Sequence, residues 1–390
     1  MYKIQTLNAI SDVIHEYLGA DKYLIAKEEP VPDGILVRSA DMHSMDLNDS
    51  LKAIARAGAG TNNIPIDECT KRGIAVFNTP GANANAVAEL VVCGLMLCSR
   101  DIPGGIEWVK SELKGKGEDV PKLVEKGKKQ FVGPEVRGKT LGVIGLGAIG
   151  AIVANAASQG LGMDVVGFDP FISVESAWAL SRSIKRSTNM DEAFAQADYI
   201  TLHVPLMDST RRLINAEAIA KMKDGVHILN FSRAGLVDSE AMIAALKSGK
   251  VAGYVTDFPT DEFIGVKNAV MIPHLGASTP ESEENCASMA AKELKNYLEN
   301  GQIQNSVNLP DMMLGYSEGS RVQIIHDNVP NMVSSISSAI SAKQININNM
   351  LNKSRREVAV TVMELDTHPD DAVLDEIKAI PGVIRVRVFA

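Results

Sequence analysis

The sequence predicts an α/β protein with two doubly wound parallel sheets, followed by a small βαββαβ unit of the ferredoxin-like type. First, short aliphatic runs alternate with helical segments from Tyr2 to Ser99, and again from Thr140 onward. Second, only 5% of the residues are aromatic, which favours aliphatic parallel-sheet packing over an all-β sandwich. Third, the order of elements from Val322 is strand, helix, two strands, helix and strand.

The first series consists of short β-like runs, each followed by Gly, Pro, Asp or Asn. The predicted strands are Tyr2–Leu7, Leu24–Lys27, Ile35–Arg38, Leu51–Ala55 and Ile74–Asn78. Helices are predicted at Ser11–Leu18 and Ala84–Ser99. This alternation indicates an open parallel sheet with helices on its faces.

A polar segment, Lys110–Lys139, separates the two series. It carries many lysines among acidic residues and is interrupted by glycines. We expect an exposed arm or connector. Its lysines have two interpretations, a solvated face or part of a site for an anionic ligand.

The second series predicts a complete doubly wound sheet, because its strands are separated by crossovers of the right length. The predicted strands are Leu141–Ile144, Val165–Phe168, Tyr199–His203, Val226–Asn230, Val251–Thr256 and Val270–Pro273. The predicted helices are Ala148–Gln159, Asp191–Ala197, Ala216–Lys223, Ser239–Lys247 and, after the last strand, Pro280–Glu299.

The C-terminal segment has a different order of predicted strands and helices. Strands are predicted at Val322–His326, Ile345–Leu351, Val358–Leu365 and Ile384–Phe389, with helices at Val329–Ala342 and Asp370–Ile380. The connector Asn308–Gly319 contains Pro and Gly residues and is a plausible domain boundary.

Composition excludes several classes of protein. The chain has 39 Lys and Arg against 48 Asp and Glu, a net charge of −9, so a dedicated nucleic-acid binder is not expected. The N-terminus has no apolar signal core, and the richest apolar stretch, Val87–Cys98, is too short to span a bilayer. We therefore expect a soluble protein with no membrane partner.

The four cysteines show no metal-ligand spacing, so no metal site is predicted. Cys93 and Cys98 fall in a helical apolar pattern and are expected to be buried thiols. Unpaired thiols indicate a reducing, cytoplasmic location.

A glycine-rich loop predicts a dinucleotide site. Gly145, Gly147 and Gly150 follow a hydrophobic strand and open a helix, which is the geometry of a Rossmann fingerprint. The helix N-terminus supplies N–H groups for a pyrophosphate. Asp169 ends the next strand, where a carboxylate accepts ribose hydroxyls and repels a 2′-phosphate, so we predict NAD rather than NADP.

Three further polar segments follow strand ends of the second sheet, where doubly wound sheets bind ligands. They contain Arg233, the acidic run from Asp257 to Glu262, and His274. An Arg binds a substrate carboxylate with a bidentate fork, and a His accepts the hydroxyl proton as hydride leaves. A neighbouring carboxylate favours the charged imidazole. Each residue also has a structural interpretation, as a surface ion pair, a solvated acid or a buried structural histidine.

These motifs together resemble the D-2-hydroxyacid dehydrogenase family over nearly the whole chain. The resemblance assigns the catalytic roles to Arg233, Glu262 and His274. The family usually has a valine between the Asp and the Phe-Pro, and its absence here leaves Asp261 as an alternative to Glu262. The spacings from Arg233 and Asp257 favour Glu262.

The resemblance also implies binding residues. Those implied for the cofactor are Gly145, Gly147, Ala148, Ile149, Gly150, Asp169, Phe231, Ser232, Arg233, Asp257, His274, Gly276 and Ala277. Those implied for the substrate are Arg38, Ser39, Gly58, Gly60, Asn83 and Arg233. Amides of the glycine-rich loop at residues 58–62 suit an anionic substrate end, with Arg38 as the charge partner.

By the same resemblance, a Rossmann NAD-binding domain (84–276) is inserted in a flavodoxin-like substrate domain (1–83 and 277–307). The implied reaction is NAD-dependent oxidation of 3-phospho-D-glycerate to 3-phosphooxypyruvate, which opens phosphorylated serine biosynthesis. The alternatives are another D-2-hydroxyacid dehydrogenase, either a glyoxylate/hydroxypyruvate reductase or a D-lactate dehydrogenase, and a non-catalytic NAD(H)-sensing protein.

The C-terminal unit, 318–390, resembles an ACT domain, an amino-acid-sensing module. The resemblance implies serine as a possible effector, held by His326, Asn328 and Asn346, although Asn331 stands where the module usually has glycine. The alternative is an oligomerisation domain. A homodimer or homotetramer is expected.

Overall fold

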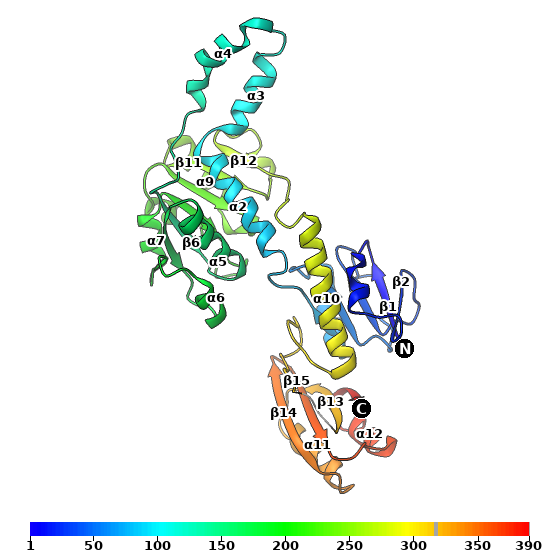
Figure 1. Ribbon diagram of the computed structural model, residues 1–390. Coiled ribbons are helices and arrows are strands. Elements are labelled where there is room, and N and C mark those ends of the chain that lie inside the picture. The colour runs from blue at the N-terminus through cyan, green and yellow to red at the C-terminus, as the bar shows by residue number, and fades with distance from the viewer. Residues whose placement is uncertain (316–318, 390) are drawn as a thin grey trace. The chain divides into compact units, whose positions relative to one another are not determined.

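The computed structural model describes residues 1–315 and 319–389. The chain divides into two compact units, one comprising Met1–Ala82 with Glu283–Ala390 and the other Asn83–Ser282 (Figure 1). Residues 316–318, which fall within the expected connector and include the first residue of the expected C-terminal domain, lie outside the described residues, as does Ala390. The C-terminal residues thus group with the N-terminal segment in one unit.

The first unit contains a parallel sheet in the order β2-β1-β3-β4-β5, which is the flavodoxin-like order. Its strands are β1 (Tyr2–Leu7), β2 (Tyr23–Ala26), β3 (Gly34–Val37), β4 (Ala53–Arg56) and β5 (Ala75–Phe77). The short helix α1 (Ile66–Lys71) covers one face, and α10 (Pro280–Asn300) with the 3₁₀ turn η1 (Asp12–Glu16) covers the other. Alternate residues of β3, β4 and β5 therefore enter two separate cores.

The same unit contains a second, antiparallel sheet in the order β14-β15-β13-β16. Its elements are β13 (Ser320–Asp327), α11 (Met332–Ser341), β14 (Ile347–Arg355), β15 (Val358–Leu365), α12 (Asp371–Lys378) and β16 (Val383–Phe389). This is the predicted βαββαβ order. Helices α11 and α12 pack on one face of the sheet, whereas Ile325 and Val360 on the other face share a core with Leu298 of α10.

Arginines fasten this sheet to the rest of the first unit by donating to main-chain carbonyl groups. The bonds are Arg387 Nη2 to Leu298 O (3.0 Å), Arg321 Nη1 to Asn300 O (3.1 Å) and Arg355 Nη1 to Ser306 O (2.6 Å). Carbonyl groups in the last turn of a helix lack intrahelical partners. At the end of α10, Arg387 and Arg321 donate the hydrogen bonds that the helix itself cannot supply to these carbonyl groups.

The second unit is built on a seven-stranded parallel sheet in the order β12-β11-β10-β9-β6-β7-β8. Its strands are β6 (Thr140–Ile144), β7 (Asp164–Phe168), β8 (Lys185–Arg186), β9 (Tyr199–Leu202), β10 (Val226–Asn230), β11 (Val251–Thr256) and β12 (Ala269–Met271). The order reverses between β6 and β9, as in a Rossmann fold. Sequence analysis missed β8 because two exposed cationic residues carry no strand pattern.

This unit contains more helices than the sequence predicted. They are α2 (Ala84–Ser99), α3 (Ile102–Glu112), α4 (Val120–Gly127), α5 (Ala148–Asn155), α6 (Val174–Ala179), α7 (Met190–Gln196), α8 (Ala216–Ala220) and α9 (Ser239–Ser248). The predicted helix Ala148–Gln159 is split, since a π-helical turn follows α5. The sequence did not reveal α3 and α4, because the charges and glycines of the segment indicated an exposed connector; a proline occupies the first turn of each helix.

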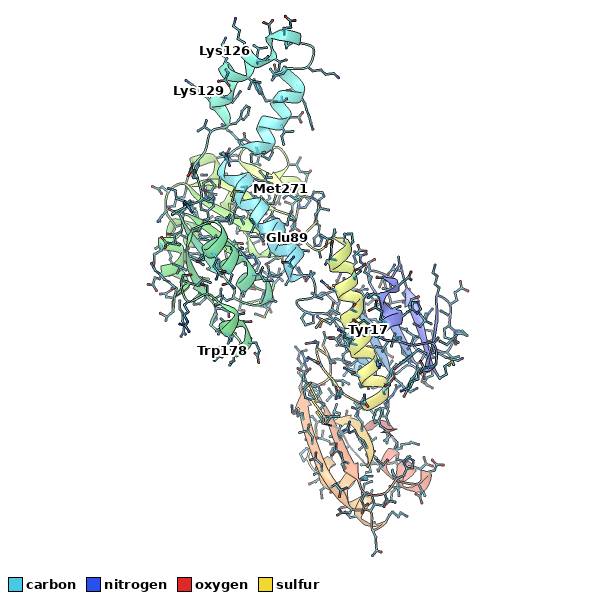
Figure 2. The ribbon with its side chains drawn as sticks, viewed as in Figure 1. Tyr17, Glu89, Lys126, Lys129, Trp178 and Met271 are labelled. Carbon is cyan, nitrogen blue, oxygen red and sulfur yellow. The ribbon has the colours of Figure 1, made fainter. Side chains whose placement is uncertain are left out.

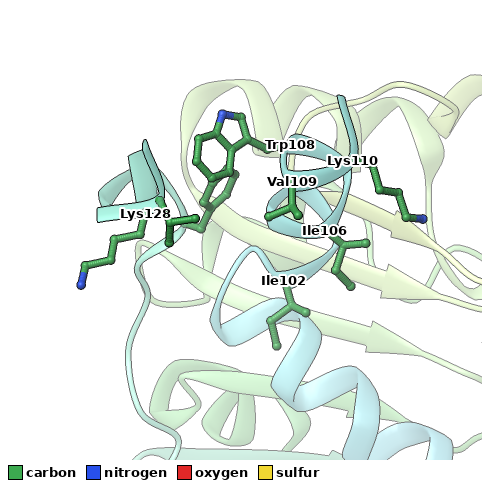
Figure 3. Close-up of a pocket in the computed structure, with 9 residues that line it drawn as sticks. Ile102, Ile106, Trp108, Val109, Lys110 and Lys128 are labelled. Atoms are coloured by element: carbon green, nitrogen blue, oxygen red, sulfur yellow. The ribbon is translucent and has the colours of Figure 1, made fainter. Parts of the chain in front are cut away.

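Helices α3 and α4 form an arm that extends from α2 (Figure 1). Its lysines are exposed, as expected, and Lys126 and Lys129 lie on its α4 side (Figure 2). The two helices enclose an apolar pocket where the rings of Trp108 and Phe131 lie 5.6 Å apart (Figure 3). The pocket is lined by Ile102, Gly105, Ile106, Trp108, Val109, Lys110, Val124, Lys128 and Phe131.

The expected burial of both helical thiols is wrong for Cys93, which is exposed on α2, whereas Cys98 is half-buried. Burial raises the pKa of the Cys98 thiol to about 12. Among the helices in the described part of the chain, none combines the length and apolarity that crossing a bilayer requires.

A buried carboxyl group in α10 makes the stability of the first unit depend on pH. Burial, with a contribution from the charge of Asp311, raises the pKa of Glu293 to about 8, although the Asn305 amide donates to it at 2.7 Å. A folded pKa above the unfolded one means that stability is lost as pH rises from about 4.5 towards 8, at about 1.4 kcal/mol per pH unit.

We expect Glu293→Gln to remove this loss. Burial lowers the pKa of His203 to about 3, which adds stability as pH rises to about 6.5, so the comparison is made above that pH. Between pH 6.5 and 8 the melting temperature, followed by circular dichroism, should fall less in the variant than in the parent. Glu284→Gln, an exposed glutamate of the same helix, is the matched control. A parallel decline in both variants would show that Glu293 does not carry the effect.

Candidate active site

The glycine-rich loop joins β6 to α5 and is shaped by close contacts. Gly145 has a φ of +93°, and a Cβ there would lie 2.6 Å from the carbonyl oxygen of His203. A Cβ at Gly150 would lie 1.9 Å from the carbonyl oxygen of Gly145. A Cβ at Gly147 would meet nothing within 4 Å, so its absence leaves open space beside the first turn of α5. This space and the N–H groups of that turn fit a dinucleotide pyrophosphate.

Asp169, at the end of β7, is held by the main chain of this loop. Its Oδ2 accepts from the Leu146 N–H and its Oδ1 from the Phe171 N–H, both at 2.8 Å. Each oxygen has further acceptor capacity, so the fixed carboxylate can also bind ribose hydroxyls. Asp169 thus also has a structural role, because it caps the turn that follows it and holds the glycine-rich loop.

The turn after β10 presents Arg233. Asn230 shapes the turn, because its Oδ1 accepts from the Ser232 N–H at 3.2 Å and its Nδ2 donates to the Arg233 carbonyl at 2.9 Å. The Ser232 hydroxyl donates to Leu202 O on the neighbouring strand at 2.7 Å. The Arg233 side chain remains exposed at the carboxyl end of the sheet.

The segments after β11 and β12 bring Asp257 and His274 together. The His274 N–H donates to Asp257 O at 3.0 Å, and Asp257 Oδ2 accepts from the Gly276 N–H at 3.1 Å. Asp257 is almost fully buried, and burial raises its pKa against the opposing effects of the Gly276 bond and the charges of His274 and Arg233. Asp257 Oδ1 has no partner among the described residues, which leaves a buried acceptor for a cofactor donor.

His274 itself adopts an unfavourable backbone conformation. Its φ of +32° lies in the left-handed region, and its ring packs against Phe258 with centroids 4.8 Å apart. Such strain is concentrated at functional sites, where the surrounding structure enforces it. The conformation holds an exposed imidazole at the carboxyl edge of the sheet.

The expected acidic partners of His274 lie in the short turn η6 (Asp261–Phe263). Asp261 and Glu262 are both exposed, and within the described residues neither forms a hydrogen bond or an ion pair with His274. The carboxyl group that the charge of His274 influences is that of Asp257, whose pKa it lowers against the effect of burial. The choice between Asp261 and Glu262 stays open.

The first unit gathers the expected substrate residues at the carboxyl ends of β3 and β4. Arg38 and Ser39 follow β3, while Gly58 and Gly60 lie in the loop after β4, and the pairing of Val37 with Arg56 brings the two ends together. The Ser39 N–H donates to Asn8 Oδ1 at 3.0 Å. Asn83 precedes α2 in the second unit and makes no side-chain cap there.

Sequence analysis missed one residue of this edge, Arg56. Its Nε donates to the Arg38 carbonyl at 3.0 Å, and a Cβ at Gly58 would lie 2.7 Å from its Nη1. Two guanidinium groups therefore occupy neighbouring strand ends. The signal was the position of Arg56 at the end of a predicted strand, directly before the glycine-rich loop.

The expected effector residues do not come together within one chain. His326 and Asn328 lie at the Asp327 end of β13, whereas Asn346 precedes β14 at the opposite end of the sheet, because Ile347 and Ser320 both pair with Leu365. Both ring nitrogens of His326 are engaged, by Asp327 O at 2.7 Å and Thr361 Oγ1 at 2.8 Å. A single effector site made from all three residues of one chain is therefore not formed.

Asn331, which stands where glycine is usual in the module, has a φ of +70°. Asparagine tolerates this region better than most residues, so the turn before α11 keeps the conformation that glycine would allow.

Comparison with known proteins agrees with this architecture. A family model described as "D-isomer specific 2-hydroxyacid dehydrogenase, NAD binding domain" matches residues 94–276. D-3-phosphoglycerate dehydrogenase of Haemophilus influenzae is 33% identical over 342 residues, which is 85% of this chain and 79% of the relative. The chain therefore belongs to the D-isomer-specific 2-hydroxyacid dehydrogenase family, and its second unit contains an NAD-binding domain.

Two further relatives carry the same enzyme name. D-3-phosphoglycerate dehydrogenase of Synechocystis is 37% identical over 292 residues, covering 73% of this chain and 50% of the relative, so the chain spans about half the length of that protein. The solved NAD⁺-bound 3-phosphoglycerate dehydrogenase of Entamoeba histolytica is 28% identical with a TM-score of 0.58, over 79% of this chain and 98% of that one.

We expect Asp169→Ala to relax the preference for NAD over NADP. Removing the carboxylate abolishes its repulsion of a 2′-phosphate, and the ratio of kcat/KM for the two cofactors should fall at least about tenfold. Asp169→Asn is the matched control for structure, since its amide oxygen can still accept from one of the two N–H groups. An unchanged ratio in both variants would move the role elsewhere.

Proposed function

We propose that the chain catalyses NAD-dependent oxidation of 3-phospho-D-glycerate to 3-phosphooxypyruvate, the first step of phosphorylated serine biosynthesis. The observation that carries this proposal is the placement of Arg233, Asp257 and His274 at the ends of neighbouring parallel strands, on the same edge as the glycine-rich loop. The similarity to several D-3-phosphoglycerate dehydrogenases supports the choice of substrate.

NAD, when bound, accepts the hydride from the hydroxyl-bearing carbon. The glycine-rich loop and the first turn of α5 would hold its pyrophosphate, Asp169 would bind its ribose, and Asp257 Oδ1 would supply an acceptor. The other residues proposed to contact the cofactor lie in the first turn of α5 and in the segments after β10 and β12. They are Ala148, Ile149, Phe231, Ser232, Gly276 and Ala277.

His274 takes the hydroxyl proton on a ring nitrogen as the hydride departs, so the proton and the hydride leave by different routes. The carboxylates of Asp257 and Glu262 stabilise the resulting imidazolium. For the second of these acids we prefer Glu262 to Asp261. Arg233 binds the substrate carboxylate and polarises the oxygen that becomes the oxo group. Arg38, Arg56 and the amides of Gly58 and Gly60 bind the phosphate end.

The proposed organisation follows from these roles. Residues 1–83 and 277–307 form the substrate domain, 84–276 the NAD-binding domain, and 318–390 an ACT-like domain for regulation or oligomerisation. We propose a cytoplasmic homodimer or homotetramer, with serine as the effector to be tested.

An assay of NADH absorbance tests the function. The purified chain is supplied with 3-phosphoglycerate and NAD, or with phosphooxypyruvate and NADH, beside D-lactate and glyoxylate. Preferred turnover of the phosphorylated pair supports the proposal. Preferred turnover of D-lactate or glyoxylate would indicate another enzyme of this family, and binding of NADH without any turnover would indicate a sensing protein.

We expect His274→Asn to lower kcat at least about a hundredfold, because the general base is lost. Asparagine tolerates the positive φ of this residue better than alanine, so the variant removes the imidazole with little change to the backbone. The dissociation constant for NADH, measured by fluorescence, should stay within about twofold of the parent. Equal loss of NADH binding would contradict the assigned role.

We expect Arg233→Lys to lower kcat/KM by at least about tenfold, since an ammonium group cannot reproduce a bidentate fork. Arg212→Lys, an exposed arginine of the same unit, is the control. Near-normal kcat/KM in Arg233→Lys would argue against the carboxylate-binding role.

A further inference from the structure

The Arg38 guanidinium, which the proposed function assigns to substrate, already holds an anion from the chain itself. Its Nη2 lies 2.7 Å from Oε1 of Glu283, in the first turn of α10. The two side chains are distant in sequence, and the contact forms because α10 packs across the sheet that contains β3. Arg38 is 38% exposed and Glu283 45% exposed, so solvent reaches both.

The charge at this edge is therefore only partly available to a ligand. The Arg38 guanidinium contributes one positive charge to this edge, and the Glu283 carboxylate offsets it. A phosphate monoester carries a charge between about −1.5 and −2 at neutral pH, so it competes with the Glu283 carboxylate for this guanidinium. A ligand that uses the charge of Arg38 has to displace the Glu283 carboxylate.

The exposure of the pair makes this displacement feasible. Half-exposed ion pairs gain little stability, because water solvates both ions and two long side chains lose freedom. A phosphate that contacts a guanidinium through two parallel N–H groups forms a stronger bond than the single Nη2 contact of Glu283. The Glu283 carboxylate stays stabilised after it leaves Arg38, because it lies in the first turn of a helix, where negative charge is favourable.

We propose that Glu283 is a specificity-determining residue, which occupies Arg38 in the free protein and yields it to the phosphate-bearing end of the substrate. The proposal rests on the proposed function in that it takes the substrate to carry a distal phosphate. For every ligand that binds Arg38, the affinity is lowered by the free energy of displacing Glu283. Ligands without a distal anion do not displace Glu283, so their affinity is unaffected. Glu283 thus sets how much a distal phosphate adds to the affinity of a ligand.

The test measures anion binding directly. Inorganic phosphate is titrated into the full chain in the presence of NADH and followed by calorimetry. Glu283→Gln should bind phosphate about two- to fivefold more tightly than the parent, the range expected for removing a weak exposed pair. The KM for 3-phosphoglycerate should fall by the same factor while kcat and the dissociation constant for NADH stay unchanged.

Two controls separate the pair from the general charge of the helix. Glu284→Gln makes the same charge change one residue further on, at a side chain that forms no ion pair with any described residue, and should leave phosphate binding unchanged. In an Arg38→Ala background, Glu283→Gln should add no gain, as a double-mutant cycle requires of two groups that act through each other.

Unchanged or weaker phosphate binding in Glu283→Gln overturns the proposal, the latter because it would mean that Glu283 orients Arg38 for the ligand. An equal gain in Glu284→Gln, or a gain that persists without Arg38, also overturns it. Tighter phosphate binding without turnover of 3-phosphoglycerate would leave Glu283 as a competitor for Arg38 and reject the proposed function instead.

Discussion

Parallel strand pairing is the constraint on which the proposed site depends. In the second unit it aligns the carboxyl ends of β6, β7, β10, β11 and β12, so residues more than a hundred positions apart in sequence meet at one edge. The reversal of strand order between β6 and β9 leaves room there for a ligand. The same rule acts in the first unit, where pairing of β3 with β4 sets Arg38 beside Arg56.

Burial and charge then give these edges their chemistry. The carboxyl group of Asp257 is withdrawn from water, which raises its pKa, while Arg233 and His274 stay exposed at the same edge. Glu283 shows the opposite situation, an exposed carboxylate paired with an exposed guanidinium. Water weakens such a pair, so a ligand can exchange with it, whereas the buried Asp257 carboxyl stays fixed by its bond from Gly276.

Much of the fold could be predicted because aliphatic strands and their punctuation are local signals. The strands Tyr2–Leu7, Val226–Asn230, Val251–Thr256 and Val358–Leu365 agree residue for residue with the prediction. The arm was predicted as exposed but not as helical, because its lysines, acidic residues and glycines are typical of a connector. Arg56 was overlooked because its role depends on a neighbouring strand end.

The sequence by itself determined the two doubly wound sheets and the glycine-rich loop, since each rests on residues close together in the chain. Only the folded molecule joined the main chains of Asp257 and His274, separated Asn346 from His326, and brought Glu283 onto Arg38. These outcomes depend on strand register and on how α10 crosses its sheet. Both arise from contacts between distant segments, which no local pattern encodes.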